Sequence, residues 1–189
     1  MARKSGRGSL LKIVTALIVI AAIGFAAFRF VSIRQGGQQA DEVLDRMKQL
    51  IPGLGVDTGV STGSGKEQLS VITIQGIDIV GCVEIPALDI MVPVTAEGNE
   101  QTGFVTYVSG SPVSGELRLK GSREDIFNSL ASAKPGDNVA FTDVEGVRYN
   151  YRVTTQYHLK SWDESDDDLM LCYPTDSKTD FVVGCKVAQ

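Results

Sequence analysis

The chain has 189 residues, of which 43% are hydrophobic, and this is enough for one domain with a real core. Its formal net charge at pH 7 is −5. All 23 acidic residues follow position 34, together with only 12 of the 18 basic ones, so this part carries a net charge of −11 and is a poor candidate for binding nucleic acid.

An apolar stretch near the N-terminus predicts a membrane anchor. Leu10–Phe28 is apolar except for Lys12 and Thr15, which matches the length needed to cross a bilayer. Four basic residues precede or open the stretch and two follow it, so the positive-inside rule places the N-terminus in the cytoplasm. We therefore expect residues 1–34 to be a basic tip and a single-pass anchor in the cell membrane, with the C-terminal domain extracellular. A cleaved signal peptide stays open as an alternative.

Residues 35–67 are expected to connect this anchor to a folded domain. Ala40–Ile51 places apolar residues at helical spacing, which predicts a short amphipathic helix. The helix has three possible places: against the domain, on the membrane, or over a groove. Pro52–Lys66 is rich in Gly, Ser and Thr, which is typical of a flexible tether.

Residues 68–189 are expected to form one all-β domain. The segments with strand character are Leu69–Ile74, Ile79–Ile85, Asp89–Val94, Phe104–Val108, Glu116–Leu119, Asn138–Phe141, Val147–Thr154, Asp168–Cys172 and Phe181–Val187. So many closely spaced strands favour a sandwich or a closed barrel. One helix is predicted at Glu124–Ser132, followed by a turn at Lys134–Asp137.

The best candidate for chemistry is Cys172, at the tip of a short buried strand predicted from the run DLMLCYP at 168–174. A thiol is a nucleophile only as thiolate, so an active Cys172 needs a cationic or hydrogen-bonding neighbour that lowers its pKa. The sequence is poor in such neighbours. The only histidine is His158, in a polar segment expected to be a loop, and the segment after Cys172 offers Lys178 and Lys186.

Nine short segments follow one another in an order that resembles the sortase family, the membrane-anchored cysteine transpeptidases of Gram-positive surfaces. They are VGCVEIP (80–86), LDIMVPV (88–94), SGSP (109–112), LRLKG (117–121), FNSL (127–130), KPGD (134–137), VAFTD (139–143), YNYRV (149–153) and DLMLC (168–172). The resemblance is closest to class B-like members. It implies a closed eight-stranded β-barrel with one or two short helices behind an N-terminal transmembrane helix.

The resemblance also implies a site made of a cysteine, a histidine and an arginine. Cys172 matches the nucleophile, although Leu171 stands where a threonine usually precedes it. Ser122, after Gly121, stands at the histidine position. Asp180 stands at the arginine position, and a shift of one residue would place Thr179 or Phe181 there.

Neither Ser122 nor Asp180 can do the work of the group it replaces. A serine hydroxyl cannot act as an imidazolium, and a carboxylate near a thiol raises the thiol pKa. We therefore expect a catalytically impaired pseudo-sortase that binds or scaffolds a peptide sorting signal, a surface protein or a pilin, without a cofactor. An active transpeptidase in which Cys172 uses an unusual partner such as His158 stays open, and so does an anchored β-domain of unrelated role.

Two further features have alternative interpretations. The acidic run Asp163–Asp168 lacks the spaced ligands and the central glycine of a calcium loop, so we interpret it as a solvated turn and expect no metal site. Cys82 and Cys185 lie in predicted core strands, where a small apolar residue is ordinary. A disulfide between them stays open.

Overall fold

The computed structural model divides the chain into two compact units, Met1–Gln35 and Gly36–Gln189. It describes residues 18–19, 21, 37–51, 53–55, 68–99, 101–122, 126–160, 165–175 and 179–188. Most of the predicted anchor and most of the predicted tether lie outside these residues. Among the described residues, no helix is both long enough and apolar enough to cross a membrane.

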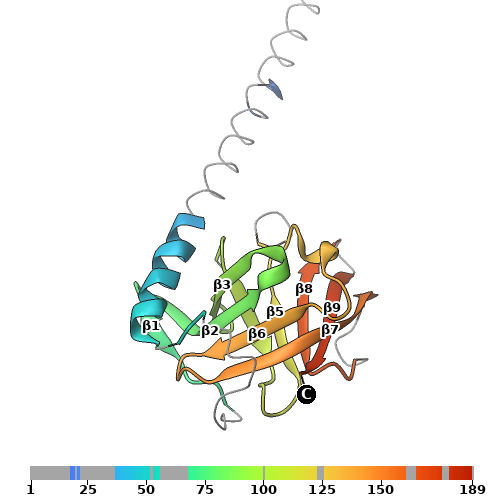
Figure 1. Ribbon diagram of the computed structural model, residues 1–189. Helices are drawn as coiled ribbons and strands as arrows, with labels where there is room; N and C mark the ends of the chain where they lie inside the picture. The colour runs from blue at the N-terminus through green and yellow to red at the C-terminus, as the bar shows by residue number, and fades with distance from the viewer. Residues whose placement is uncertain are drawn as a thin grey trace, which may run out of the picture. The chain divides into compact units, whose positions relative to one another are not determined.

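Nine strands of the second unit form one continuous sheet, and each corresponds to a predicted segment (Figure 1). They are β1 (Ile72–Ile74), β2 (Ile77–Ile85), β3 (Ile90–Thr95), β4 (Val105–Ser109), β5 (Leu117–Lys120), β6 (Asn138–Asp143), β7 (Arg148–Leu159), β8 (Leu169–Pro174) and β9 (Asp180–Val187). The sheet order is β1-β2-β3-β4-β5-β8-β9-β7-β6, and β6 pairs again with β2. Strands β2 to β9 therefore close an eight-stranded barrel, as predicted, and β1 is an added strand beside β2.

The strands alternate between two faces, as a sheet with one buried face must. On β5 and β8, Leu117, Leu119, Leu169 and Leu171 point into the main core, which Phe141 and Tyr151 fill from β6 and β7. The residues between them face outward. Two parallel pairs, β3 with β4 and β5 with β8, interrupt the antiparallel pattern.

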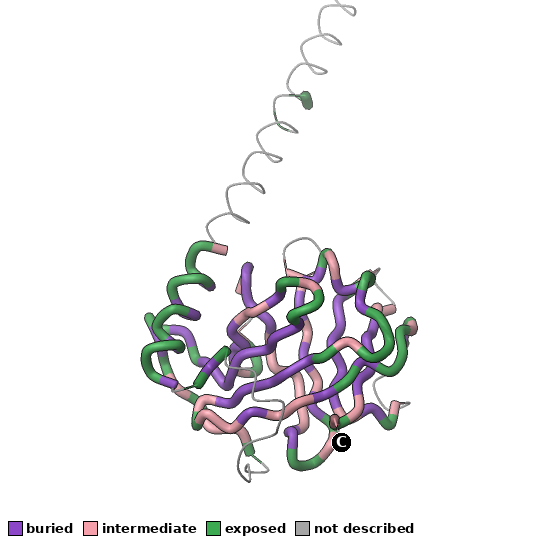
Figure 2. Tube along the Cα trace, viewed as in Figure 1, coloured by how far each residue is buried: buried purple, intermediate pink, exposed green. Residues whose placement is uncertain are grey.

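The predicted amphipathic helix spans residues 37–50 and packs on the domain (Figures 1 and 2). Its buried face is made by Val43, Leu44 and Met47, which form a second apolar cluster with Ile79 and Cys82 of β2. Of the three places considered for this helix, the structure therefore shows the first, against the domain. Leu54, at the start of the predicted tether, is buried in the same cluster.

The helix predicted at Glu124–Ser132 is wrong over its described part. Residues 126–129 form turns, and Leu130–Ser132 is a single turn of 3-10 helix, η2, with Leu130 N donating to Phe127 O at 3.2 Å. A second 3-10 turn, η1, spans Pro86–Leu88. Phe127 and Leu130 of the predicted apolar stripe are fully buried, as expected. So short a segment, however, does not offset the free-energy cost of helix nucleation.

The three cysteines are free and buried, so Cys82 and Cys185 are not joined. The sheet itself separates them, because Cys82 lies in the cluster under the 37–50 helix and Cys185 lies in the core inside the barrel.

Candidate functional site

Cys172 lies in β8 on the outer face of the barrel. Its neighbours Leu171 and Tyr173 point into the main core, whereas Cys172 belongs to a small separate cluster with Leu159, Met170 and Val182. Val182 of β9 stands directly opposite Cys172. The side chain has no exposed surface, so the thiol is covered although it does not face the interior.

The structure brings Ser122 and Asp180, which the resemblance aligned with the family's histidine and arginine, to the same end of the sheet. Gly121 N donates to Cys172 O at 2.8 Å, which places Ser122 just beyond the end of β5 beside β8. Asp180 begins β9 opposite Pro174, two residues after Cys172. The three therefore converge where β5, β8 and β9 lie side by side.

The alternation of side chains also places Asp180 and Phe181 on opposite faces of β9. Asp180 shares the outer face with Val182 and Cys172. Phe181 points to the other face, where its ring stacks on that of Tyr173 with centroids 5.0 Å apart. Of Asp180 and Phe181, Asp180 is the one on the face of the thiol.

The surroundings raise the pKa of the Cys172 thiol well above its ordinary value. Burial is the main cause, the negative charge of Asp180 adds to it, and the positive charge of Lys120 opposes both. At neutral pH this thiol is protonated and therefore a poor nucleophile.

Lys120 is the cation that the sequence did not reveal. It ends β5 directly opposite Cys172 in the parallel β5–β8 pair, so the two side chains share the outer face. Its neighbour on that face, Arg118, stands opposite Met170. Lys120 is part of the segment LRLKG, but only the register of β5 with β8, in which paired residues are 52 positions apart in the sequence, places it at the thiol.

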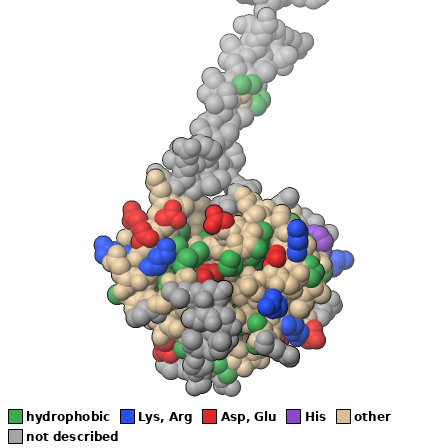
Figure 3. All heavy atoms as spheres, in the orientation of Figure 1, with side chains coloured by type: hydrophobic (Ala, Val, Ile, Leu, Met, Phe, Trp, Pro, Cys, Tyr) green, Lys and Arg blue, Asp and Glu red, His purple; other side chains and the backbone are tan. Residues whose placement is uncertain are grey.

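His158 lies in β7 and not in the predicted loop. It stands opposite Phe181 and meets that ring edge-on, with centroids 5.5 Å apart. In the neighbouring positions, Tyr157 stands opposite Val182, and Val182 stands opposite Cys172. These three side chains lie on the opposite face of the sheet from His158. This only histidine is exposed (purple in Figure 3), and the sheet separates it from the thiol.

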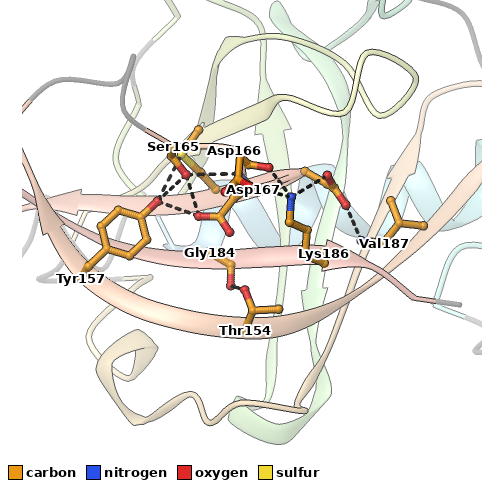
Figure 4. A network of polar contacts seen from close by, with 10 residues as sticks. Thr154, Tyr157, Ser165, Asp166, Asp167, Gly184, Lys186 and Val187 are labelled. Atoms are coloured by element: carbon orange, nitrogen blue, oxygen red, sulfur yellow. Dashed lines mark hydrogen bonds and ion pairs between the residues drawn. The ribbon is translucent and has the colours of Figure 1, made fainter.

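Hydrogen bonds and ion pairs connect residues 165–168, which precede β8, to the outer face of the barrel beside the Cys172 cluster (Figure 4). The carboxylate of Asp167 accepts hydrogen bonds from Tyr157 Oη and Ser165 Oγ, each at 2.7 Å, and Asp167 is only 6% exposed. The interpretation of this acidic run as a solvated turn is therefore wrong for Asp167. Burial is the main cause that raises the pKa of Tyr157, to about 12.

The same network continues along β9. Lys186 Nζ lies 3.3 Å from Asp168 Oδ1, and Val187 N donates to Asp168 Oδ2 at 2.8 Å. Asp167 covers Gly184, where a Cβ atom would overlap its carboxylate. Within the described part of the chain, no cluster of three or more His, Cys, Asp or Glu side chains has the arrangement of a metal site.

Several solved structures share this fold. Sortase C1 of Streptococcus agalactiae matches with a TM-score of 0.50 and 22% identity, over 59% of this chain and 68% of that one. Sortase A of Listeria monocytogenes matches with a TM-score of 0.50 and 21% identity, over 59% and 88%. A lid mutant of Corynebacterium diphtheriae sortase A matches with a TM-score of 0.50 and 15% identity, over 84% and 90%. No protein-family profile and no curated protein matches the sequence. The fold is therefore sortase-like, as the sequence motifs implied.

Proposed function

We propose that this chain is a sortase-family protein of the cell surface that binds an extended peptide segment of a surface protein or pilin without turning it over. In this proposal residues 1–34 hold it in the cell membrane with the N-terminus in the cytoplasm, residues 35–67 connect the anchor to the barrel, and residues 68–189 present the Cys172 face outside.

The observation that carries the proposal is the environment of Cys172. Transpeptidation requires a thiolate that attacks a peptide carbonyl and a donor that protonates the leaving amine. Here the thiol is fully buried, and burial and Asp180 both raise its pKa. Ser122 stands at the same end of the sheet but offers only a hydroxyl, and His158 faces the other side.

One observation favours the alternative, an active cysteine transpeptidase. Lys120 is a cation directly opposite Cys172, and its charge lowers the pKa of the thiol. An active enzyme built on this chain would therefore use Lys120 as the partner of Cys172 and not His158.

Two measurements on one set of variants separate the proposals. In a Cys82→Ala/Cys185→Ala background, alkylation of Cys172 followed against pH gives the thiol pKa, and single-turnover mass spectrometry with sorting-signal peptides detects an acyl-enzyme. We expect slow alkylation, a raised pKa and no covalent intermediate. Asp180→Asn should lower the thiol pKa and Lys120→Gln should raise it.

A Cys172→Ala variant is the control for both measurements. If Cys172 titrates below about pH 7 and a peptide adduct forms on it, the binding proposal is wrong and the active alternative is correct. If the adduct forms and Lys120→Gln leaves its rate unchanged, Lys120 is not the partner.

A further inference from the structure

Strand β5 places two basic side chains on the outer face, in line with the cluster of Cys172. Arg118 stands opposite Met170 and Lys120 stands opposite Cys172, so both project from the same side of the barrel as the thiol. Both side chains are half-buried. This part of the face is therefore positively charged in a domain that is otherwise strongly acidic.

Neither side chain has a hydrogen bond or an ion pair among the described residues, and the Nε atom of Arg118 is buried without an acceptor. Two other basic residues of the barrel do have carboxylate partners: Arg148 Nη1 lies 2.7 Å from Glu84 Oε1, and Lys186 Nζ lies 3.3 Å from Asp168 Oδ1. A half-buried cation without a carboxylate partner can form charge-assisted hydrogen bonds with an incoming anion.

The spacing of the two cations indicates the kind of anion. Residues 118 and 120 lie two positions apart on one strand, so their Cα atoms are separated by about 6.6 Å. Alternate side chains of an extended peptide have the same separation. On β4, Ser109 and Thr106 stand opposite Arg118 and Lys120, which adds hydroxyl groups to this side of the face.

We infer that the outer face of β5 is a subsite for an extended peptide with acidic side chains at alternate positions, one carboxylate bound by Arg118 and the next by Lys120. The inference rests on the proposed function, because it names the peptide that the Cys172 face selects. Asp180, on the other side of Cys172, repels carboxylates and so directs the acidic side chains toward β5.

The experiment measures fluorescence anisotropy of labelled, end-capped peptides with the full chain. The test peptide contains Glu-Ala-Glu, one control has the same charge with adjacent glutamates, Glu-Glu-Ala, and a second has Gln-Ala-Gln. We expect the alternating acidic peptide to bind about tenfold or more tightly than either control, because only it presents two carboxylates on one side.

Variants then locate the subsite. Arg118→Gln and Lys120→Gln should each weaken the test peptide by about tenfold and leave the Gln-Ala-Gln peptide unchanged. Arg152→Gln is the matched control, since it removes one positive charge from a distant part of β7, where Arg152 donates to Gly136 O at 3.1 Å.

The outcomes distinguish the two proposals. This inference is wrong if the three peptides bind equally, or if the two variants bind the test peptide as tightly as the unaltered chain does. Either result would leave the proposed function unaffected. If none of the peptides and no sorting-signal peptide binds, both are wrong. The comparison of peptides on the unaltered chain does not depend on how well any variant folds.

Discussion

At the scale of single residues, Gly184 shows how a buried carboxylate constrains a strand. Asp167 lies directly on Gly184, and Thr154 Oγ1 donates to Gly184 O at 3.0 Å from the neighbouring strand β7. A methyl group at this position would have to displace Asp167 from the hydroxyl groups of Tyr157 and Ser165. The small residue in the run VVGCKV is therefore required by packing on the outer face.

We predict that Gly184→Ala lowers the free energy of unfolding by about 2–4 kcal/mol, since it combines overpacking with the loss of hydrogen bonds to a buried acid. Urea denaturation measures the change. Gly37→Ala is the control, because no atom lies within 4 Å of a Cβ built there, and it should be neutral or slightly stabilising. A Gly184→Ala variant as stable as the unaltered chain would show that Asp167 is not fixed in this place.

The residues of the candidate site were only partly predictable from sequence. Cys172 stood out because an apolar run ends on it, and its strand is present. Lys120 did not stand out, because its proximity to the thiol depends on the parallel register of β5 and β8. Asp167 was misread, because an acidic run is normally solvated and nothing in the sequence indicates which carboxylate is buried.

At the scale of secondary structure, the 37–50 helix covers part of the outer face of β2. It buries Val43 and Met47 completely against a cluster that includes Ile77 and Ile79. The outer face of β2 is apolar for this reason, and without the helix that cluster would be exposed to water.

We predict that Met47→Ala destabilises the domain by about 2–5 kcal/mol, because it leaves a cavity between helix and sheet. Leu50→Ala is the matched control on the same helix, since Leu50 is 63% exposed and its change should stay within about 0.5 kcal/mol. Chemical denaturation of the two variants tests this directly. Equal effects of the two substitutions would mean that the helix does not pack as described.

The strands were predictable because alternation and turn residues mark them, and all nine are present. The ends of the strands were less predictable. Strand β7 continues to Leu159 through the exposed, polar residues 154–156 and 158, and their polarity made the segment containing His158 resemble a loop. The predicted helix at 124–132 had the right apolar residues, but burial of Phe127 and Leu130 is equally compatible with turns.

At the scale of the whole molecule, stability should depend on alkaline pH through the three cysteines. Burial is the main cause that raises the pKa of Cys82, Cys172 and Cys185 above the ordinary value. Unfolded thiols ionise near pH 8.5, whereas the folded ones stay protonated, so the unfolded state binds fewer protons above that pH. The stability that these groups contribute is complete below about pH 8.5 and falls as pH rises.

We predict that the free energy of unfolding, measured by urea denaturation with a reductant present, is constant from pH 7 to 8 and falls above about pH 8.5, by up to about 1.4 kcal/mol per pH unit for each thiol. Cys185→Ala should have a shallower slope, whatever its stability at pH 7. A midpoint that does not change up to pH 10 would contradict the burial of these thiols.

During synthesis, the barrel stays open until its last two strands have emerged. In the sheet, β8 and β9 lie between β5 and β7, although both follow β7 in the chain. A nascent chain that ends after β7 therefore presents two unpaired strand edges, which are sites for aggregation and for chaperones. The strand that carries Cys172 closes this gap together with β9, so the face around the thiol exists only in chains that have been translated to the end of β9.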